Sequence, residues 1–213
     1  MAVPRIVLLG PPASGKGTQG RLLANKGGLA YFSTGRQLRR ELKAGTELGR
    51  RADPYLAAGC YVPDELALAL ALTWVSGVDG GWVLDGFPRT LPQAQDLDAF
   101  LAPQEAALRA LILEVPKDEL ELRVGERREC SVCPWTGTRS GADPSGRCPS
   151  CGAELVQRSD DDLGNFRMRF KAFDELTAPV AGYYETSDRL RRVSGVGSPE
   201  EVFRRIQSVF HLD

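Results

Sequence analysis

Residues 5–18 read RIVLLGPPASGKGT, an apolar run that ends in a glycine-rich loop with a lysine and a threonine. The apolar run is typical of a buried parallel strand, and the loop would open a helix. In that setting the backbone N–H groups of the loop and the helix dipole bind phosphate oxygens. Gly10, Gly15 and Lys16 match the spacing G-x4-G-K, although one extra residue separates Lys16 from Thr18. We expect Lys16 to reach the β- and γ-phosphates of a nucleotide and Thr18 to face its Mg2+.

Four further strands are predicted by short apolar or β-branched runs that end near Gly, Ser or Pro, at residues 29–33, 81–86, 110–115 and 189–195. The sequence DELALALALTWV at residues 64–75 alternates with period two, but Ala and Leu favour helices and "PDE" is typical of a helix start. We expect a helix there. Strands that alternate with helices predict an α/β fold, with a doubly wound core of five parallel strands. Ligands should bind beyond the carboxyl ends of these strands.

Two C-x2-C pairs, separated by a Gly/Ser/Pro-rich tip, hold four of the five cysteines. Two such turns can close a tetrahedral cage of four thiolates with no open position, which is typical of a structural zinc site. A single iron also suits such a cage, and disulfides are the remaining alternative, which a reducing compartment disfavours. Cys60 stands alone, and we expect it to be a small buried hydrophobic residue. The predicted metal ligands are Cys130, Cys133, Cys148 and Cys151.

Composition and charge restrict the partners. The chain has 213 residues, 42% of them hydrophobic, and its formal net charge of -1 provides no basic field for nucleic acid or an anionic membrane. The apolar run near the N-terminus is too short for a membrane span and is broken by Pro and Gly. We therefore expect a cytoplasmic protein that binds neither nucleic acid nor membrane. Because no apolar stripe is evident beyond the core, we also expect a monomer. The single histidine, His211, is expected at the surface.

Charged residues recur near the predicted strand ends. Asp85 ends the third strand, where an acidic residue can hold Mg2+ or its waters in P-loop enzymes. Arginine offers a planar fork of donors that suits phosphate oxygens, and arginines stand near the strand ends and on both flanks of the cysteine segment. These candidates are Arg39, Arg89, Arg123, Arg127, Arg128, Arg158, Arg167 and Arg169.

Six segments, in this order and spacing, resemble adenylate kinase of the bacterial type whose lid carries a zinc ribbon: GPPASGKGTQ, STGRQLR, GCYVPDE, DGFPRTLPQA, LRVGERREC and QRSDDD followed by RMR. The similarity spans nearly the whole chain. It implies the P-loop nucleoside monophosphate (NMP) kinase fold, with a core formed by residues 1–32, 63–124 and 163–213. It also implies an NMP-binding insertion at residues 33–62 and a zinc-binding lid at residues 125–162.

The resemblance implies a site for MgATP. The P-loop would hold the phosphates, Arg123 and Arg127 would approach ATP from the lid hinge, and Gly197 would approach the adenine through its backbone. Thr18 and Asp85 would belong to the Mg2+ shell. The implied ATP-binding residues are Ala13, Ser14, Gly15, Lys16, Gly17, Thr18, Arg123, Arg127, Thr136, Gly137 and Gly197.

The resemblance also implies a site for AMP. Thr34 is typical of adenylate kinases, whereas uridylate and cytidylate kinases usually have a small residue there. Val62 would act through its backbone near the base. The implied AMP-binding residues are Thr34, Arg39, Cys60, Tyr61, Val62, Gly86, Phe87, Pro88, Arg89, Gln93, Arg158 and Arg169. The implied catalytic residues are Lys16, Arg89, Arg127, Arg158 and Arg169.

Four features depart from the family's pattern. Ala13 and Ser14 stand where the P-loop commonly has Gly-Ala or Gly-Ser, so the loop lacks one glycine's conformational freedom. Arg36 replaces a usually acidic residue, and Cys60 stands where Lys is common. The segment after Cys133 reads PWTGTRSGADPSG, where the family usually has a GATYH-like pattern.

The implied reaction is reversible transfer of the γ-phosphoryl group from MgATP to AMP, which gives two ADP and serves adenine nucleotide homeostasis. The AMP phosphate is already anionic, so in-line transfer needs no general base and depends on alignment and charge neutralisation. Lid closure would exclude water, and the adenylate kinase lid is a known example of such gating. Two alternatives are a kinase for another nucleoside monophosphate, which Thr34 disfavours, and a zinc-ribbon nucleic-acid-binding ATPase, for which the tip has few basic and aromatic residues.

Overall fold

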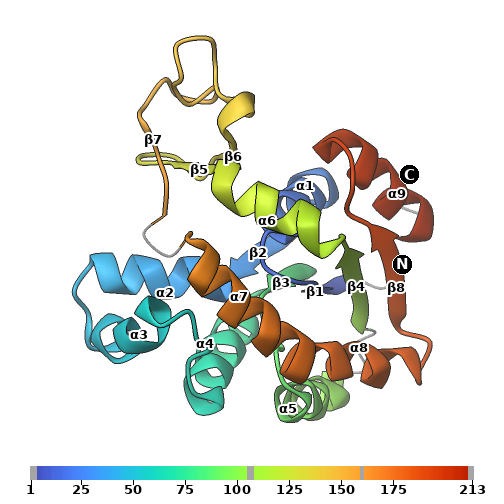
Figure 1. Cartoon of the computed structure of the whole chain (residues 1–213). Coiled ribbons are helices and arrows are strands. Elements are labelled where there is room, and N and C mark those ends of the chain that lie inside the picture. Colours follow the sequence, from blue (N-terminus) through green and yellow to red (C-terminus); the bar gives the residue numbers. More distant parts are fainter. Residues whose placement is uncertain (1–3, 105–107, 159–160, 211–213) are drawn as a thin grey trace.

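The computed structural model in Figure 1 describes residues 4–104, 108–158 and 161–210. Five parallel strands form a sheet in the order β2-β3-β1-β4-β8. They are β1 (Arg5–Leu9), β2 (Ala30–Ser33), β3 (Trp82–Asp85), β4 (Leu108–Glu114) and β8 (Leu190–Ser194). All five predicted strands and the α/β class are therefore confirmed. The expected surface position of His211 lies outside the described residues.

Helices cover both faces of this sheet. α1 (Lys16–Gly27) and α9 (Pro199–Phe210) pack on one face, and α4 (Asp64–Ser76), α5 (Leu91–Leu101) and α8 (Ala178–Glu185) pack on the other. The side chains of β1 alternate between the two faces of the sheet. Ile6 and Leu8 pack with α1 and α9, whereas Val7 and Leu9 face α4, α5 and α8. Because both faces of the strand are buried, its sequence is a continuous apolar run.

The ambiguous segment at residues 64–75 is part of helix α4, as predicted. Ala67, Ala71 and Val75 recur every fourth residue and are buried against the core, while the leucines between them are partly buried.

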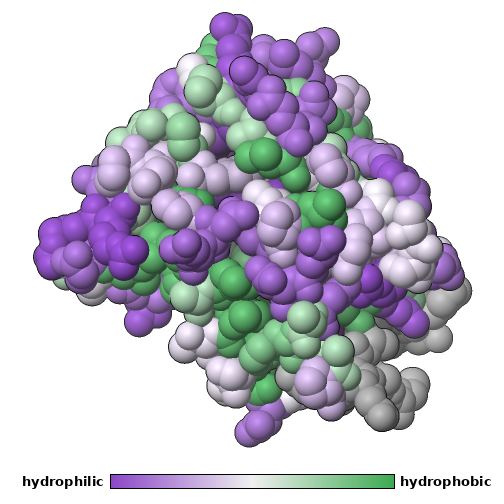
Figure 2. Space-filling view, turned by 90° about the horizontal axis from the view of Figure 1, so that it is seen from below, coloured by the Kyte–Doolittle hydropathy of each residue, from purple (hydrophilic) through white to green (hydrophobic). Residues whose placement is uncertain are grey.

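Helices α2 (Thr34–Lys43) and α3 (Glu47–Ala57) follow β2 and precede α4 along the chain. The two helices pack on each other. The packing is close at Gly49, where a Cβ atom would meet the Glu41 carbonyl oxygen at 2.4 Å. The outer end of this helix pair is hydrophilic in Figure 2, at the left of the view. There Glu47 and Arg50 form an exposed ion pair at 2.8 Å.

A second, three-stranded sheet follows α6 (Lys117–Glu126) and stands above the core in Figure 1. Its central strand β5 (Arg127–Cys130) pairs antiparallel with β6 (Thr136–Thr138) and β7 (Leu155–Val156). A 3-10 turn, Arg139–Gly141, follows β6. These strands have two to four residues and no apolar alternation, so the sequence did not predict them.

The chain returns from the small sheet through α7 (Leu163–Ala172), which a π-helical turn, Phe173–Thr177, joins to α8. A shorter 3-10 turn, Ala102–Gln104, follows α5. Helices α6 and α7 pack together through Leu120, Val124 and Phe166. Among the helices of the described ranges, none has both the length and the apolar character that a membrane span requires.

Candidate functional site

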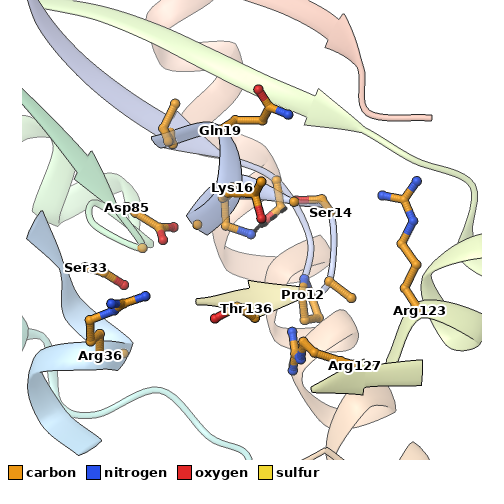
Figure 3. A pocket seen from close by; sticks show the side chains of 18 of the residues that line it. Pro12, Ser14, Lys16, Gln19, Ser33, Arg36, Asp85, Arg123, Arg127 and Thr136 are labelled. Carbon is orange, nitrogen blue, oxygen red and sulfur yellow. Dashed lines mark hydrogen bonds between the residues drawn. The ribbon is translucent and has the colours of Figure 1, made fainter. Parts of the chain in front are cut away.

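A cavity of about 700 Å³ lies at the carboxyl end of the core sheet, under the small sheet. Its wall includes Leu9, Ser33 and Asp85, the last residues of β1, β2 and β3. The other side is closed by residues 135–138 of the small sheet. Figure 3 shows side chains from these elements converging on one space. The cavity is therefore where a parallel α/β sheet is expected to bind ligands.

Lys16 begins helix α1 and points back over the glycine-rich loop (Figure 3). Its Nζ donates hydrogen bonds to the carbonyl oxygens of Gly10 and Pro11, both at 2.7 Å, and to Oγ of Ser14 at 3.3 Å. Burial lowers the pKa of Lys16 to about 8, against the opposing effect of the Asp85 carboxylate. An anion placed beside this ammonium group would restore its charge.

The departure at Ala13 is visible in the backbone. Ala13 has a φ of 65°, in the left-handed region that favours glycine, and Gly15 has a φ of 95°. For an L-residue with a Cβ atom this conformation costs roughly 1–2 kcal/mol. The loop therefore places an alanine where glycine would be unstrained.

Asp85 is buried at the floor of the cavity, where its Oδ2 accepts a hydrogen bond from the Tyr31 hydroxyl at 2.8 Å. Burial and the Asp85 carboxylate raise the pKa of Tyr31, so Tyr31 stays a donor. Arg21 lines the cavity close by, and burial lowers its pKa. Sequence analysis did not identify Tyr31 or Arg21. Arg21 could have been found, because it lies three residues after Thr18 and so shares its helix face.

Two arginines, one at the start of β5 and one just after β7, are held by acidic residues that sequence analysis missed. Arg127 makes a two-bond ion pair with the carboxylate of Asp161, which is almost fully buried. Arg158 donates from Nε to Glu129 at 2.5 Å. These pairs hold both guanidinium groups at the cavity wall, where a phosphate could compete for them.

Two arginines of the core are tied to backbone carbonyls. Arg123 donates to the Gly195 carbonyl at 3.0 Å and to Glu119 at 2.9 Å. Arg89 donates to the Gly86 carbonyl at 2.8 Å, and its guanidinium lies 4.5 Å from the centre of the Tyr61 ring. In this way both are positioned along the cavity.

The structure brings together most of the predicted arginines but not all of them. Arg128 donates to the Gly125 carbonyl, and Arg167 faces Glu121 at 3.8 Å; neither lines the cavity. Arg127 follows helix α6 and opens β5, so it does not mark the end of a core strand. The predicted arginines that line the cavity are Arg39, Arg89, Arg123, Arg127, Arg158 and Arg169.

All the residues of the predicted ATP set line the cavity. Gln19 and Pro199 also line it and were not predicted; the Gln19 amide donates to the Pro199 carbonyl at 2.9 Å. This bond links the first turn of α1 to the first residue of α9, two residues after Gly197.

Part of the predicted AMP set lines the other side of the cavity, and three members lie behind its wall. Cys60, Tyr61, Val62, Gly86 and Pro88 line it together with the arginines. The buried residues Thr34, Phe87 and Gln93 do not.

Two of these buried residues, Gln93 and Thr34, have polar side chains that differ in their hydrogen bonds. Gln93 donates to Asp64 and accepts from the Arg89 backbone, both at 2.8 Å. Within the described residues, the Thr34 hydroxyl is buried with no hydrogen-bond partner.

The expectation that Cys60 is buried is wrong. Its side chain is exposed at the edge of the cavity. It follows Gly59, whose φ of 64° turns the chain away from helix α3, so the thiol leaves the packed faces of the helices.

The four paired cysteines form one cluster. Their Sγ atoms lie within 4.8 Å of one another, with Cys130–Cys151 and Cys133–Cys148 distances of 3.5 Å. A tetrahedral ion with metal–sulfur bonds of about 2.3 Å would place sulfurs about 3.8 Å apart, so the cluster fits a zinc ion. The backbone N–H groups of Cys133 and Val132 donate to Cys130 Sγ at 3.3 and 3.4 Å, so this sulfur is fixed within the cluster.

Comparison with known proteins agrees with this geometry. The family model described as adenylate kinase matches residues 8–189. The chain is 40% identical over 210 residues to the adenylate kinase of Syntrophobacter fumaroxidans, which covers 96% of this chain and 98% of the relative. It is 40% identical over 209 residues to that of Carboxydothermus hydrogenoformans, with the same coverage. It is also 40% identical over 196 residues to that of Moorella thermoacetica, which covers 90% of each chain.

Proposed function

The chain belongs to the adenylate kinase family, and from that premise we propose how its residues carry out the family's reaction. The enzyme transfers a phosphoryl group reversibly from ATP, bound with Mg2+, to AMP, which gives two ADP. The two alternatives, a kinase for another nucleoside monophosphate and a nucleic-acid-binding ATPase, are not favoured by these relatives.

We assign three functional parts. Residues 1–32, 63–124 and 163–213 form the P-loop core, residues 33–62 form the NMP-binding insertion, and residues 125–162 form the lid. The support is that α2 and α3 make up the second part and the small sheet makes up the third, and that both border the cavity. Closing of the two insertions would remove water from the cavity and so protect the phosphoryl group from hydrolysis.

The observation that carries the site assignment is one cavity in which Lys16 and arginines from α2, α6, β5, α7 and the loops between elements converge at the ends of the core strands. An in-line transfer between two phosphate groups needs alignment and neutralisation of negative charge. Five residues would surround the transferring group and supply that charge. They are Lys16, Arg89, Arg127, Arg158 and Arg169.

The nucleotide phosphates would replace the present partners of these residues. Lys16 would exchange the carbonyls of Gly10 and Pro11 for phosphate oxygens, and Arg127 and Arg158 would turn from Asp161 and Glu129 to the ligand. Because each donor is already oriented at the cavity wall, the exchange needs little further ordering of these side chains.

ATP would lie along the P-loop, with its base near the backbone of Gly197 and its phosphates under Arg123. AMP would lie on the side of Arg39 and Arg89, with its base near the Val62 backbone. Thr18 and Asp85 would hold Mg2+ or its waters, and the ion would neutralise charge on the phosphates.

Zinc would be held by Cys130, Cys133, Cys148 and Cys151 in a closed cage with a structural role. The strands of the lid are short and its tip is largely exposed, so the metal would substitute for a hydrophobic core. A cage of this kind keeps the lid rigid while it moves. We further propose that the enzyme works as a monomer in the cytoplasm, without nucleic acid or membrane.

A coupled assay for ADP formation tests the function, with AMP, CMP, UMP and GMP compared as acceptors. ADP formation that depends on AMP is expected, and equal activity with another monophosphate would contradict the acceptor assignment. Arg169→Met should lower kcat by about 100-fold, the order expected for losing one preorganised charge contact. Arg167→Met is the matched control, because Arg167 lies on the same helix but outside the cavity, and it should leave kcat unchanged.

A further inference from the structure

A hydrogen bond connects the two walls of the cavity that belong to different insertions. Nη2 of Arg36, on helix α2, donates to the carbonyl oxygen of Pro134, in the turn between β5 and β6 of the small sheet, at 3.3 Å. The two residues are 98 positions apart in the sequence. In Figure 3 the Arg36 side chain extends from α2 into the space between Asp85 and Thr136.

The acceptor of this bond is held in a fixed position. Pro134 directly follows the cage residue Cys133, whose N–H donates to Cys130 Sγ at 3.3 Å. On its other side, Trp135 accepts a backbone hydrogen bond from Cys130 at 3.1 Å. The Pro134 carbonyl therefore moves with the cysteine cage as one unit.

The donor belongs to a different unit. Arg36 lies two residues after Thr34, in the first turn of α2, and the buried side chain of Leu38 anchors this helix. An arginine carries several donors on a long stem, and its charge strengthens a hydrogen bond to a neutral carbonyl. An acidic side chain at this position would instead repel the carbonyl oxygen.

We propose that Arg36 is a positioning residue that couples closure of the lid to closure of the NMP-binding insertion. This inference rests on the proposed function and adds that ATP, held by Arg127 of the lid, draws the lid inward, while AMP, held by Arg39 of the insertion, draws the insertion inward. The bond between Arg36 and Pro134 joins the two parts and needs them to lie as close together as they do in this structure. Each nucleotide therefore favours the arrangement that the other needs, and ATP and AMP bind cooperatively.

The test measures this coupling directly. The dissociation constant of a non-hydrolysable ATP analogue with Mg2+ is measured by calorimetry without AMP and with saturating AMP. In the wild-type enzyme AMP should tighten binding of the analogue, by a factor within the range of about 5–150 typical of coupled sites. Arg36→Met should reduce this factor by about threefold to tenfold, as expected for the loss of one charge-assisted hydrogen bond at a partly exposed position. Binding of each nucleotide alone should change less than twofold.

Two variants complete the design. Arg36→Lys keeps a charged donor on a long stem and should restore part of the coupling. Arg40→Met removes an exposed arginine one turn further along α2 and should leave the coupling unchanged.

The outcomes separate this inference from the proposed function. An unchanged coupling factor in Arg36→Met would overturn the inference. It would also be overturned if the variant bound ATP and AMP more weakly by the same factor and kept the coupling factor, because Arg36 would then be a simple phosphate ligand. The proposed function fails on a different result, which is absence of AMP-dependent ADP formation by the wild-type enzyme.

Discussion

The hydroxyl group of Tyr31 donates a hydrogen bond to Oδ2 of Asp85 at 2.8 Å. This bond fixes one oxygen of a buried carboxylate and leaves Oδ1 for other partners. Tyr31 comes from β2 and Asp85 from β3, which pair in parallel, so the sheet sets their relative positions. The proposed Mg2+ site is thus oriented by a residue that has no motif of its own.

Asp85→Asn should lower kcat by about 100-fold, because an amide lacks the negative charge that holds Mg2+ or its waters. The amide can still accept from Tyr31, so the free energy of unfolding should change little. Tyr31→Phe should lower kcat less than tenfold and raise the Mg2+ concentration needed for half-maximal activity. Both effects are measured as ADP formation over a series of Mg2+ concentrations. A wild-type Mg2+ response in Asp85→Asn would exclude the carboxylate from the metal shell.

The affinity for ATP should depend on the protonation of Lys16. Burial lowers the pKa of Lys16 to about 8 in the free enzyme, and bound phosphates raise it. ATP binding therefore takes up a proton above about pH 8. The dissociation constant for MgATP should be constant well below pH 8 and should increase above it, by up to about tenfold per pH unit. Titration calorimetry between pH 6.5 and about 9.5 measures this dependence.

Lys16→Arg is the control for this prediction, since its guanidinium stays charged over the whole range. Its affinity should be weaker but independent of pH. If the wild-type enzyme shows the same flat profile as Lys16→Arg, Lys16 does not titrate at the site.

Loss of a cage cysteine should remove the metal and destabilise the lid. Cys148 is buried in the cluster, and Cys148→Ser should bind less than one zinc per chain and unfold at a lower temperature than the wild-type enzyme. Metal analysis and a thermal melt provide the two measurements. Cys60→Ser is the matched control and should keep both the metal and the midpoint, because Cys60 lies outside the cage. An unchanged midpoint after chelation under denaturing conditions and refolding would contradict a structural metal.

Thr34→Val should separate stability from AMP binding. The Thr34 hydroxyl is buried and, among the described residues, has no hydrogen-bond partner, so its removal should not lower the free energy of unfolding. If AMP uses this hydroxyl, KM for AMP should increase by about tenfold while KM for ATP stays constant. Steady-state kinetics and urea unfolding measure the two quantities. A lower stability with an unchanged KM for AMP would assign Thr34 a purely structural role.

The elements that sequence patterns predicted are those with local signals. The central strands β1, β3 and β4 are largely apolar because both of their faces are covered, whereas the edge strands β2 and β8 have shorter apolar signals. Helix α4 is rich in helix-forming residues. The glycine-rich loop and the two cysteine pairs have spacings that relate directly to phosphate and metal geometry. Even the strain at Ala13 is local, because it follows from an alanine at a position that favours glycine.

The remaining features were decided by tertiary structure. Cys60 was expected in the core, but the turn at Gly59 exposes it. The pairing of Arg127 with Asp161, of Tyr31 with Asp85 and of Arg36 with Pro134 joins residues 34 to 98 positions apart. Sequence periodicity reports which way a side chain faces within its own helix or strand. Which charged group it meets depends on how separate elements pack, and that is set only when the whole chain has folded.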